Sequence, residues 1–170
     1  MSQMFFSGFR PRYERRGIFN LEEVLPYIGP RGRMHAPGTG IIHLSAHRYQ
    51  LMAATPGLAC VTCGIQGIYF ALERTTRRVA KVAKGKPGGY TFTYHEMPDA
   101  EWHFNLYALT EDGHEVMMTK DHIVPKSKGG HHAMYNYQLM CQKCNSRKGN
   151  IILLPASSLI LPEVMSASVV

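Results

Sequence analysis

Three polar residues in the second half of the chain have the types and spacing needed to hydrolyse a phosphodiester. Asp121 and His122 are neighbours, and Asn145 directly follows the last cysteine. A neutral imidazole can take a proton from water near neutral pH, and a carboxylate with an amide carbonyl suits a hard divalent cation. The pattern therefore predicts His122 as general base and Asp121 and Asn145 as ligands of one Mg²⁺ or Mn²⁺ ion, which would stabilise charge on the phosphate and the leaving oxygen.

Each of these side chains also has a purely structural interpretation. His122 could hydrogen-bond within its loop, Asp121 could pair with a lysine, and Asn145 could cap the last helix, a role compatible with metal binding. Asn136 lies between them in the sequence and is interpreted as a brace, because its amide can both donate to and accept from the backbone of a long loop.

All four cysteines fall in two Cys-x-x-Cys pairs, Cys60 with Cys63 and Cys141 with Cys144. Disulfide frameworks rarely use only this spacing, whereas structural zinc sites commonly do. Four thiolates can close one tetrahedral Zn²⁺ site. The spacing predicts a four-cysteine zinc site joining two distant segments, with disulfides, free thiols or a redox function as the alternatives.

The elements that position these residues can be placed from the hydrophobic pattern. Residues 102–109 alternate as a strand does, Asp112-Gly113 is a hairpin signal, and residues 115–120 return as a second strand. Asp121-His122 is therefore expected at the end of a two-stranded ribbon. A short helix is expected to begin near Cys144.

The chain is predicted to have three parts. Residues 1–44 form a basic N-terminal extension with a short helix, Leu21 to Ile28, that Asn20 can cap. Residues 45–150 form the zinc-stapled domain. Residues 151–170 form an apolar tail, in which the apolar run Ile151 to Leu161 is too short to span a bilayer and is interrupted by Pro155.

Four further segments have recognisable local signals. Residues 30–40 are rich in Gly and Pro and indicate a linker, while Ser45 can cap a helix that ends near Ala54. Residues 67–72 have strand character. Residues 74–89 are crowded with Lys and Arg and indicate either a solvated basic helix and loop or a surface that contacts phosphates.

The net charge of +7 and the sequence pI near 9.4 favour a polyanionic partner, nucleic acid before a membrane surface, although such a charge can also serve only solubility. His131 and His132 are interpreted as solvated loop residues, with substrate contact or metal assistance as the alternative, and His47 is given no role. The absence of a visible secretion signal favours a reducing, cytoplasmic location. The predicted phosphate contacts are Lys126, Lys128, Arg147, Lys148, Arg77 and Arg78, with plain surface charge as the alternative for the cations of the last helix.

The run Asp121-His122-Ile-Val-Pro-Lys-Ser-Lys-Gly-Gly130, then Asn136, then Cys141-x-x-Cys144-Asn145-x-x-Lys148-Gly149 resembles the HNH endonucleases, the ββα-metal superfamily. The resemblance covers roughly residues 57–150 and looks closest to the zinc-stapled kind found in phages, mobile elements and restriction systems. It implies an α+β fold and places the catalytic site at His122, Asp121, Asn145 and Asn136, with the four cysteines on structural zinc. The third position of the family motif is often His and here is Asn145, which favours Mg²⁺ or Mn²⁺ over softer ions.

The resemblance further implies cleavage of double-stranded DNA to 5′-phosphate and 3′-hydroxyl ends, with the ββα unit against the minor groove. Two rival functions fit the same residues. A non-catalytic zinc module that binds nucleic acid explains the cysteines and the charge but gives Asp121 and His122 no task. A toxin-like nuclease with an immunity partner would share the chemistry. The target sequence, the oligomeric state and nicking against double-strand cutting stay open.

Overall fold

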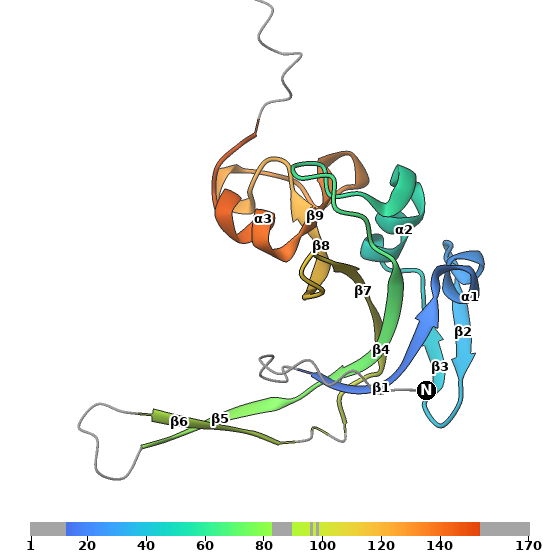
Figure 1. Ribbon diagram of the computed structural model, residues 1–170. Helices are drawn as coiled ribbons and strands as arrows, with labels where there is room; N and C mark the ends of the chain where they lie inside the picture. Colours follow the sequence, from blue (N-terminus) through green and yellow to red (C-terminus); the bar gives the residue numbers. More distant parts are fainter. Residues whose placement is uncertain (1–12, 83–89, 96, 98, 154–170) are drawn as a thin grey trace, which may run out of the picture.

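The protein combines an antiparallel sheet with short helices, in agreement with the predicted α+β class. The computed structural model describes residues 13–82, 90–95, 97 and 99–153. Five strands form the main sheet in the order β1-β4-β7-β8-β9, and each neighbouring pair is antiparallel (Figure 1). The strands are β1 (Tyr13–Asn20), β4 (Tyr69–Thr75), β7 (His103–Leu109), β8 (Glu115–His122) and β9 (Tyr137–Cys141).

The prediction of a helical N-terminal extension is wrong. The first described element is β1, which pairs with β4 from Tyr13↔Thr75 to Asn20↔Tyr69 as an edge strand of the main sheet. The expected helix begins where predicted, and the backbone N–H of Asn20 donates to the Glu23 carboxylate at 2.6 Å. It lasts one turn as α1 (Leu21–Val24) and tightens into a 3-10 turn, η1 (Leu25–Tyr27), where a proline removes a backbone donor.

The predicted Gly- and Pro-rich linker contains a hairpin. Strands β2 (Arg33–Ala36) and β3 (Gly40–His43) pair with each other, and Gly38 supplies the positive φ of the turn between them. Helix α2 (His47–Ala54) follows, close to its predicted range, but its N-cap is Ala46 rather than Ser45. The 3-10 turn η2 (Pro56–Leu58) then leads to the first cysteine pair.

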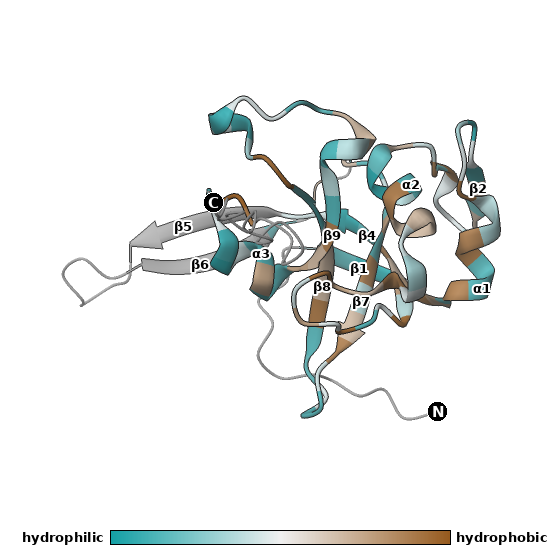
Figure 2. Ribbon diagram, turned by 90° about the horizontal axis from the view of Figure 1, so that it is seen from above, coloured by the Kyte–Doolittle hydropathy of each residue, from teal (hydrophilic) through white to brown (hydrophobic). Residues whose placement is uncertain are grey.

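One hydrophobic core unites both halves of the chain. Val24, Leu44 and Tyr49 from the first half are fully or almost fully buried, as are Phe104 and Leu139 from the second. Figure 2 shows hydrophobic residues recurring along α1, β7 and β8, the elements that enclose this core. Burial of these side chains, rather than helix propensity, fixes the short helices in place.

The basic segment after β4 departs from the predicted helix and loop. Its first two residues end β4, and strand β5 (Arg77–Val82) follows, paired with β6 (Tyr90–His95) in a separate two-stranded sheet. Figure 1 shows this hairpin continuing from the end of β4 beyond the main sheet. The rest of the predicted basic segment, residues 83–89, and most of the predicted tail, residues 154–170, lie outside the described residues.

The predicted ribbon of two strands is confirmed as β7 and β8, with Asp121 and His122 as the last residues of β8. The structure adds a strand that the sequence did not reveal, β9, which pairs with β8 from Met118↔Cys141 to His122↔Tyr137. Helix α3 (Gln142–Lys148) follows at once and begins two residues before its predicted start at Cys144. No described helix has the length and apolar character needed to cross a membrane.

Candidate active site and metal centre

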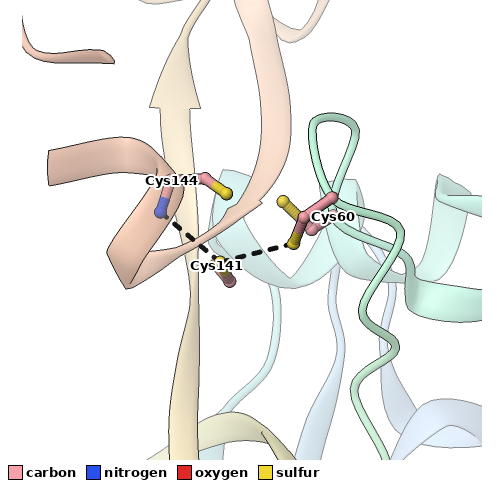
Figure 3. Close-up of side chains that lie close together, drawn as sticks. Cys60, Cys141 and Cys144 are labelled. Atoms are coloured by element: carbon pink, nitrogen blue, oxygen red, sulfur yellow. Dashed lines mark hydrogen bonds between the residues drawn. The ribbon is translucent and has the colours of Figure 1, made fainter. Parts of the chain in front are cut away.

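The four cysteines converge at the junction between the two halves of the chain. Cys60 and Cys63 lie in a turn after η2, Cys141 ends β9, and Cys144 lies in the first turn of α3. Their sulfur atoms all lie within 4.8 Å of one another, and none is in a disulfide. Figure 3 shows Cys60 facing Cys141 and Cys144 across this junction.

The cluster fits one tetrahedral metal ion such as zinc. A tetrahedron with Zn–S bonds of about 2.3 Å has S–S edges of about 3.8 Å, and Cys63 Sγ lies 3.8 Å from Cys141 Sγ. Although burial opposes it, backbone hydrogen bonds lower the pKa of Cys60 to about 7, whereas burial raises the pKa of Cys144 to about 12. A cation is therefore needed before all four sulfurs can be thiolates together.

Asp121 and Asn145 both face the α3 side of β8. Gln138 Nε2 donates to Asp121 Oδ2 at 2.8 Å, and Lys148 Nζ lies 3.0 Å from the same oxygen. Asn145 Nδ2 donates to Thr119 Oγ1 at 3.0 Å, two residues before Asp121 on β8. The two predicted metal ligands thus share one face, but the direct partner of the carboxylate is an ammonium group.

Lys148 differs from its prediction as a phosphate contact on the helix surface. Its side chain is only 1% exposed, and its Nζ also donates to the main-chain oxygen of His122 at 2.7 Å. This lysine therefore ties α3 to the end of β8 and has no surface left for DNA.

His122 points its imidazole to the opposite face of β8. Its ring makes edge contacts with His132 and Tyr137, with centroid distances of 5.0 and 4.9 Å. Its Nε2 is buried without a hydrogen-bond partner. Neighbouring side chains alternate in direction along a strand, so Asp121 and His122 flank β8 from opposite faces.

Asn136 bonds the loop between β8 and β9 at three points. Its Oδ1 accepts from the Val124 N–H at 2.8 Å, and its Nδ2 donates to the oxygens of Val124 and His131 at 3.1 and 2.9 Å. Gly130 fits beside it because a Cβ there would lie 1.8 Å from Val124 O. These are the bonds expected of a loop brace.

The other predicted phosphate contacts are dispersed. Lys126 and Lys128 are exposed in the 3-10 turn η3 (Lys126–Lys128), and Arg147 is exposed on α3. Arg77 and Arg78 lie on β5, in the hairpin beyond the main sheet.

Four residues around His122 were not predicted from the sequence to surround it. His132 is exposed as predicted, but its Nδ1 lies 3.1 Å from the Tyr137 hydroxyl. Lys120 Nζ lies 3.9 Å from the centre of the Tyr137 ring, and the His47 ring lies 5.6 Å from it. Only Lys120 had a signal in the sequence, since it precedes His122 by two positions and must share its face of the strand.

This surrounding keeps His122 neutral. Burial lowers the pKa of its imidazole below the ordinary value of 6.5, and it is lowered further by the positive charges of Lys120 and Lys126 and by His132 when that ring is protonated. The pKa of His132 is lowered as well, by desolvation and by the charges of Lys126 and Lys120. An imidazole with a lowered pKa is unprotonated, and so able to accept a proton, at neutral pH.

The comparisons with known proteins agree with this arrangement. Residues 110–158 match the model of the HNH endonuclease family. The match covers β8, the loop braced by Asn136, β9 and α3. Neither the comparison with curated proteins nor that with solved structures gave a match.

Proposed function

With residues 110–158 assigned to the HNH endonuclease family, we propose that the protein is a metal-dependent endonuclease that hydrolyses phosphodiester bonds of double-stranded DNA. One observation carries the proposal: a ββα unit of β8, β9 and α3 holds Asp121 and His122 at a strand end and Asn145 on the adjoining helix. The pattern of charge, zinc cysteines and loop brace supports it.

The unpaired edge of β8 is a place where one phosphate could reach both Asp121 and His122, although they lie on opposite faces of the strand. β8 pairs with β7 only from Glu115 to Met117, and with β9 from Met118 to His122. Among the described residues no strand covers the other edge of β8 from Met118 to His122. A phosphate at this edge, near the strand end, would meet Asp121 from one face and His122 from the other.

The residues that would hold a catalytic Mg²⁺ or Mn²⁺ are Asp121 and Asn145. Both contacts of Asp121 engage Oδ2, so its Oδ1 is the oxygen left for an ion. Asn145 uses Nδ2 as a donor, which leaves its carbonyl oxygen as the ligand. These hard oxygen donors fit such an ion, whose chemistry when bound is to stabilise charge on the phosphate and the leaving oxygen.

His122 would act on water from the opposite face. Its neutral imidazole accepts the proton that a water loses as it attacks phosphorus. Tyr137 and His132 hold the ring by edge contacts, and Lys148 holds the main chain of the same residue. As in the family, the products would carry 5′-phosphate and 3′-hydroxyl ends.

The zinc is proposed to be structural and the setting cytoplasmic, where thiols stay reduced. Val61 N–H donates to Leu139 O at 3.0 Å, so the first cysteine turn also contacts β9 directly. The division at residue 44 is proposed only as a description of the chain's order. Residues on both sides of it pack into one core.

The test is digestion of supercoiled plasmid by purified protein with Mg²⁺, Mn²⁺ or EDTA. We expect cutting with either ion, none with EDTA, and a loss of at least about a hundredfold for His122→Ala, the usual contribution of a general base. His114→Ala is the matched control, since that histidine lies in an exposed turn and its side chain pairs with the exposed Asp112. Full cutting by His122→Ala would overturn the assignment of the base.

A non-catalytic nucleic-acid-binding module is the second candidate, and one observation favours it. The Lys148–Asp121 pair supplies a positive charge at the predicted ligand without any ion. A protein of this kind would shift duplex DNA in a gel and leave plasmid intact under every metal condition. It would also bind DNA equally well after His122→Ala.

A further inference from the structure

Outside the candidate active site, the surface between α2 and β8 is hollowed. A cavity of about 460 Å³ lies there, lined by Ser45, Ala46, His47, Arg48 and Lys120. Its wall joins an element of the first half of the chain to the strand that carries Asp121 and His122. None of these lining residues is among the predicted catalytic, metal-binding or phosphate-contacting residues.

The lining of this cavity is positively charged. Arg48 and Lys120 each bring a full charge, and none of the described residues that line it is acidic. A neighbouring hollow shares Ser45 and Arg48 but includes the carboxylate of Glu101. An anion would therefore be repelled less in the cavity beside Lys120 than in the neighbouring one.

Tyr137 connects the cavity to His122. The ring of Tyr137 contacts Lys120 and His47, both of which line the cavity, and it also contacts the imidazole of His122. Because one buried aromatic ring touches all three, the cavity opens on the same face of β8 as the proposed base.

The two cations are held in place by aromatic rings. The Arg48 guanidinium lies 4.5 Å from the centre of the Tyr49 ring, and its Nη2 donates to the Tyr49 hydroxyl at 2.5 Å. Lys120 lies over Tyr137. Arg48 keeps further N–H donors, so a fixed guanidinium and a fixed ammonium can bind an anion with little loss of side-chain entropy.

We propose that this cavity binds a backbone phosphate of the DNA strand, next to the phosphate that is cut, through Arg48 and Lys120. The inference rests on the proposed function for its choice of ligand. It adds a subsite that draws the first half of the chain into substrate binding. The strand would then run along the His122 face of β8 toward α2.

The test measures binding without cleavage. Fluorescent duplex DNA is titrated with the zinc-loaded full-length protein carrying His122→Ala, without added Mg²⁺ or Mn²⁺ and without chelator, at several salt concentrations. Adding Lys120→Met or Arg48→Met should weaken binding about threefold to tenfold and reduce the slope of log K against log salt by about 0.9, the value for one lost phosphate contact. Lys120→Arg should restore most of both.

Lys143→Met is the matched control, since Lys143 is exposed on α3 and lies near Asp112 at the other end of β8. Circular dichroism and zinc content check folding, and the Arg48 variant keeps the test decisive if the Lys120 variant fails to fold. Equal slopes for the control and for a folded cavity variant would overturn the proposal. Binding is measured here separately from the plasmid digestion. A protein that binds DNA through these residues but does not cut plasmid would contradict the proposed function and leave the phosphate subsite standing.

Discussion

At the scale of single residues, the buried ion pair of Lys148 with Asp121 couples the metal-ligand candidate to the stability of the fold. Its ammonium lies within 3.0 Å of Asp121 and is almost fully buried. Removing one partner of a buried ion pair leaves an uncompensated charge, which is far more costly than removing both. The pair therefore links the stability of α3 to the same carboxylate that is proposed to bind metal.

Lys148→Met should lower the free energy of unfolding by about 3 kcal/mol, because the Asp121 carboxylate is left buried without its cation. The double variant Lys148→Met with Asp121→Asn should recover part of that loss. Urea unfolding of the wild type, both single variants and the double variant measures the coupling. Additive effects would mean that the two side chains do not interact in solution.

His122 makes a second prediction, on pH. Its pKa is lowered by burial and then by His132, Lys120 and Lys126, so the base stays neutral until the pH falls below the ordinary histidine range. kcat/KM should therefore stay level near neutral pH and decline only below the ordinary value of 6.5. In Lys120→Met one lowering charge is gone, and the decline should move to higher pH.

The measurement is kcat/KM for an oligonucleotide duplex across the acidic range, with zinc content checked at each pH. Lys143→Met should keep the wild-type profile. A profile that does not move in Lys120→Met would show that the acidic limb reports another group.

At the scale of elements, the loop between β8 and β9 depends on one side chain. Asn136 makes three hydrogen bonds to the loop backbone, and its own main-chain oxygen accepts from Ile123 N at 2.9 Å. Asn136→Ala should cost about 1 to 3 kcal/mol, since partly buried backbone groups of the loop lose their partners. Amide hydrogen exchange at Val124 should speed up far more than exchange at Leu106 in β7, and equal protection at both would contradict the brace.

The elements also show what the sequence could and could not predict. β7 and β8 were predictable because residues alternate in polarity and Asp112-Gly113 marks the turn between them. β9 was missed because Tyr137–Cys141 is short and runs straight into α3 without a Gly or Pro signal. The candidate site residues could be proposed from residue types, but the facing of His122 away from Asn145 required the pairing of β8 with β9.

The predictions for the first half of the chain failed for a related reason. Gly and Pro in residues 30–40 suggest a linker when read locally, yet the segment pairs as β2 and β3 and buries Ala36 and Ile42. β1 carries two arginines, and the half-buried Arg15 bonds the buried carboxylate of Glu73 at 2.7 Å and the partly buried carboxylate of Glu115 at 2.6 Å. A basic segment becomes part of a sheet when distant carboxylates neutralise it, and local composition does not show those partners.

At the scale of the whole molecule, the cysteine cluster joins segments that are far apart in the sequence. Cys60 and Cys63 bring the region after α2 to the start of α3, and the cavity beside Lys120 lies between the same two halves. Zinc bound only in the folded state contributes its binding free energy to folding. The geometry of the proposed phosphate subsite should therefore depend on the metal.

Cys63 gives the sharpest test, because it is the exposed member of the cluster. A surface substitution usually changes stability by no more than roughly 0.5 kcal/mol, so Cys63→Ser should be nearly neutral unless it removes a zinc ligand. We expect one zinc per chain in the wild type, clear loss of zinc in Cys63→Ser, and a fall in melting temperature well beyond that of Thr62→Ser, the exposed neighbour. A Cys63→Ser protein as stable as the Thr62→Ser control, with four freely titrating thiols in the native wild type, would contradict a structural zinc.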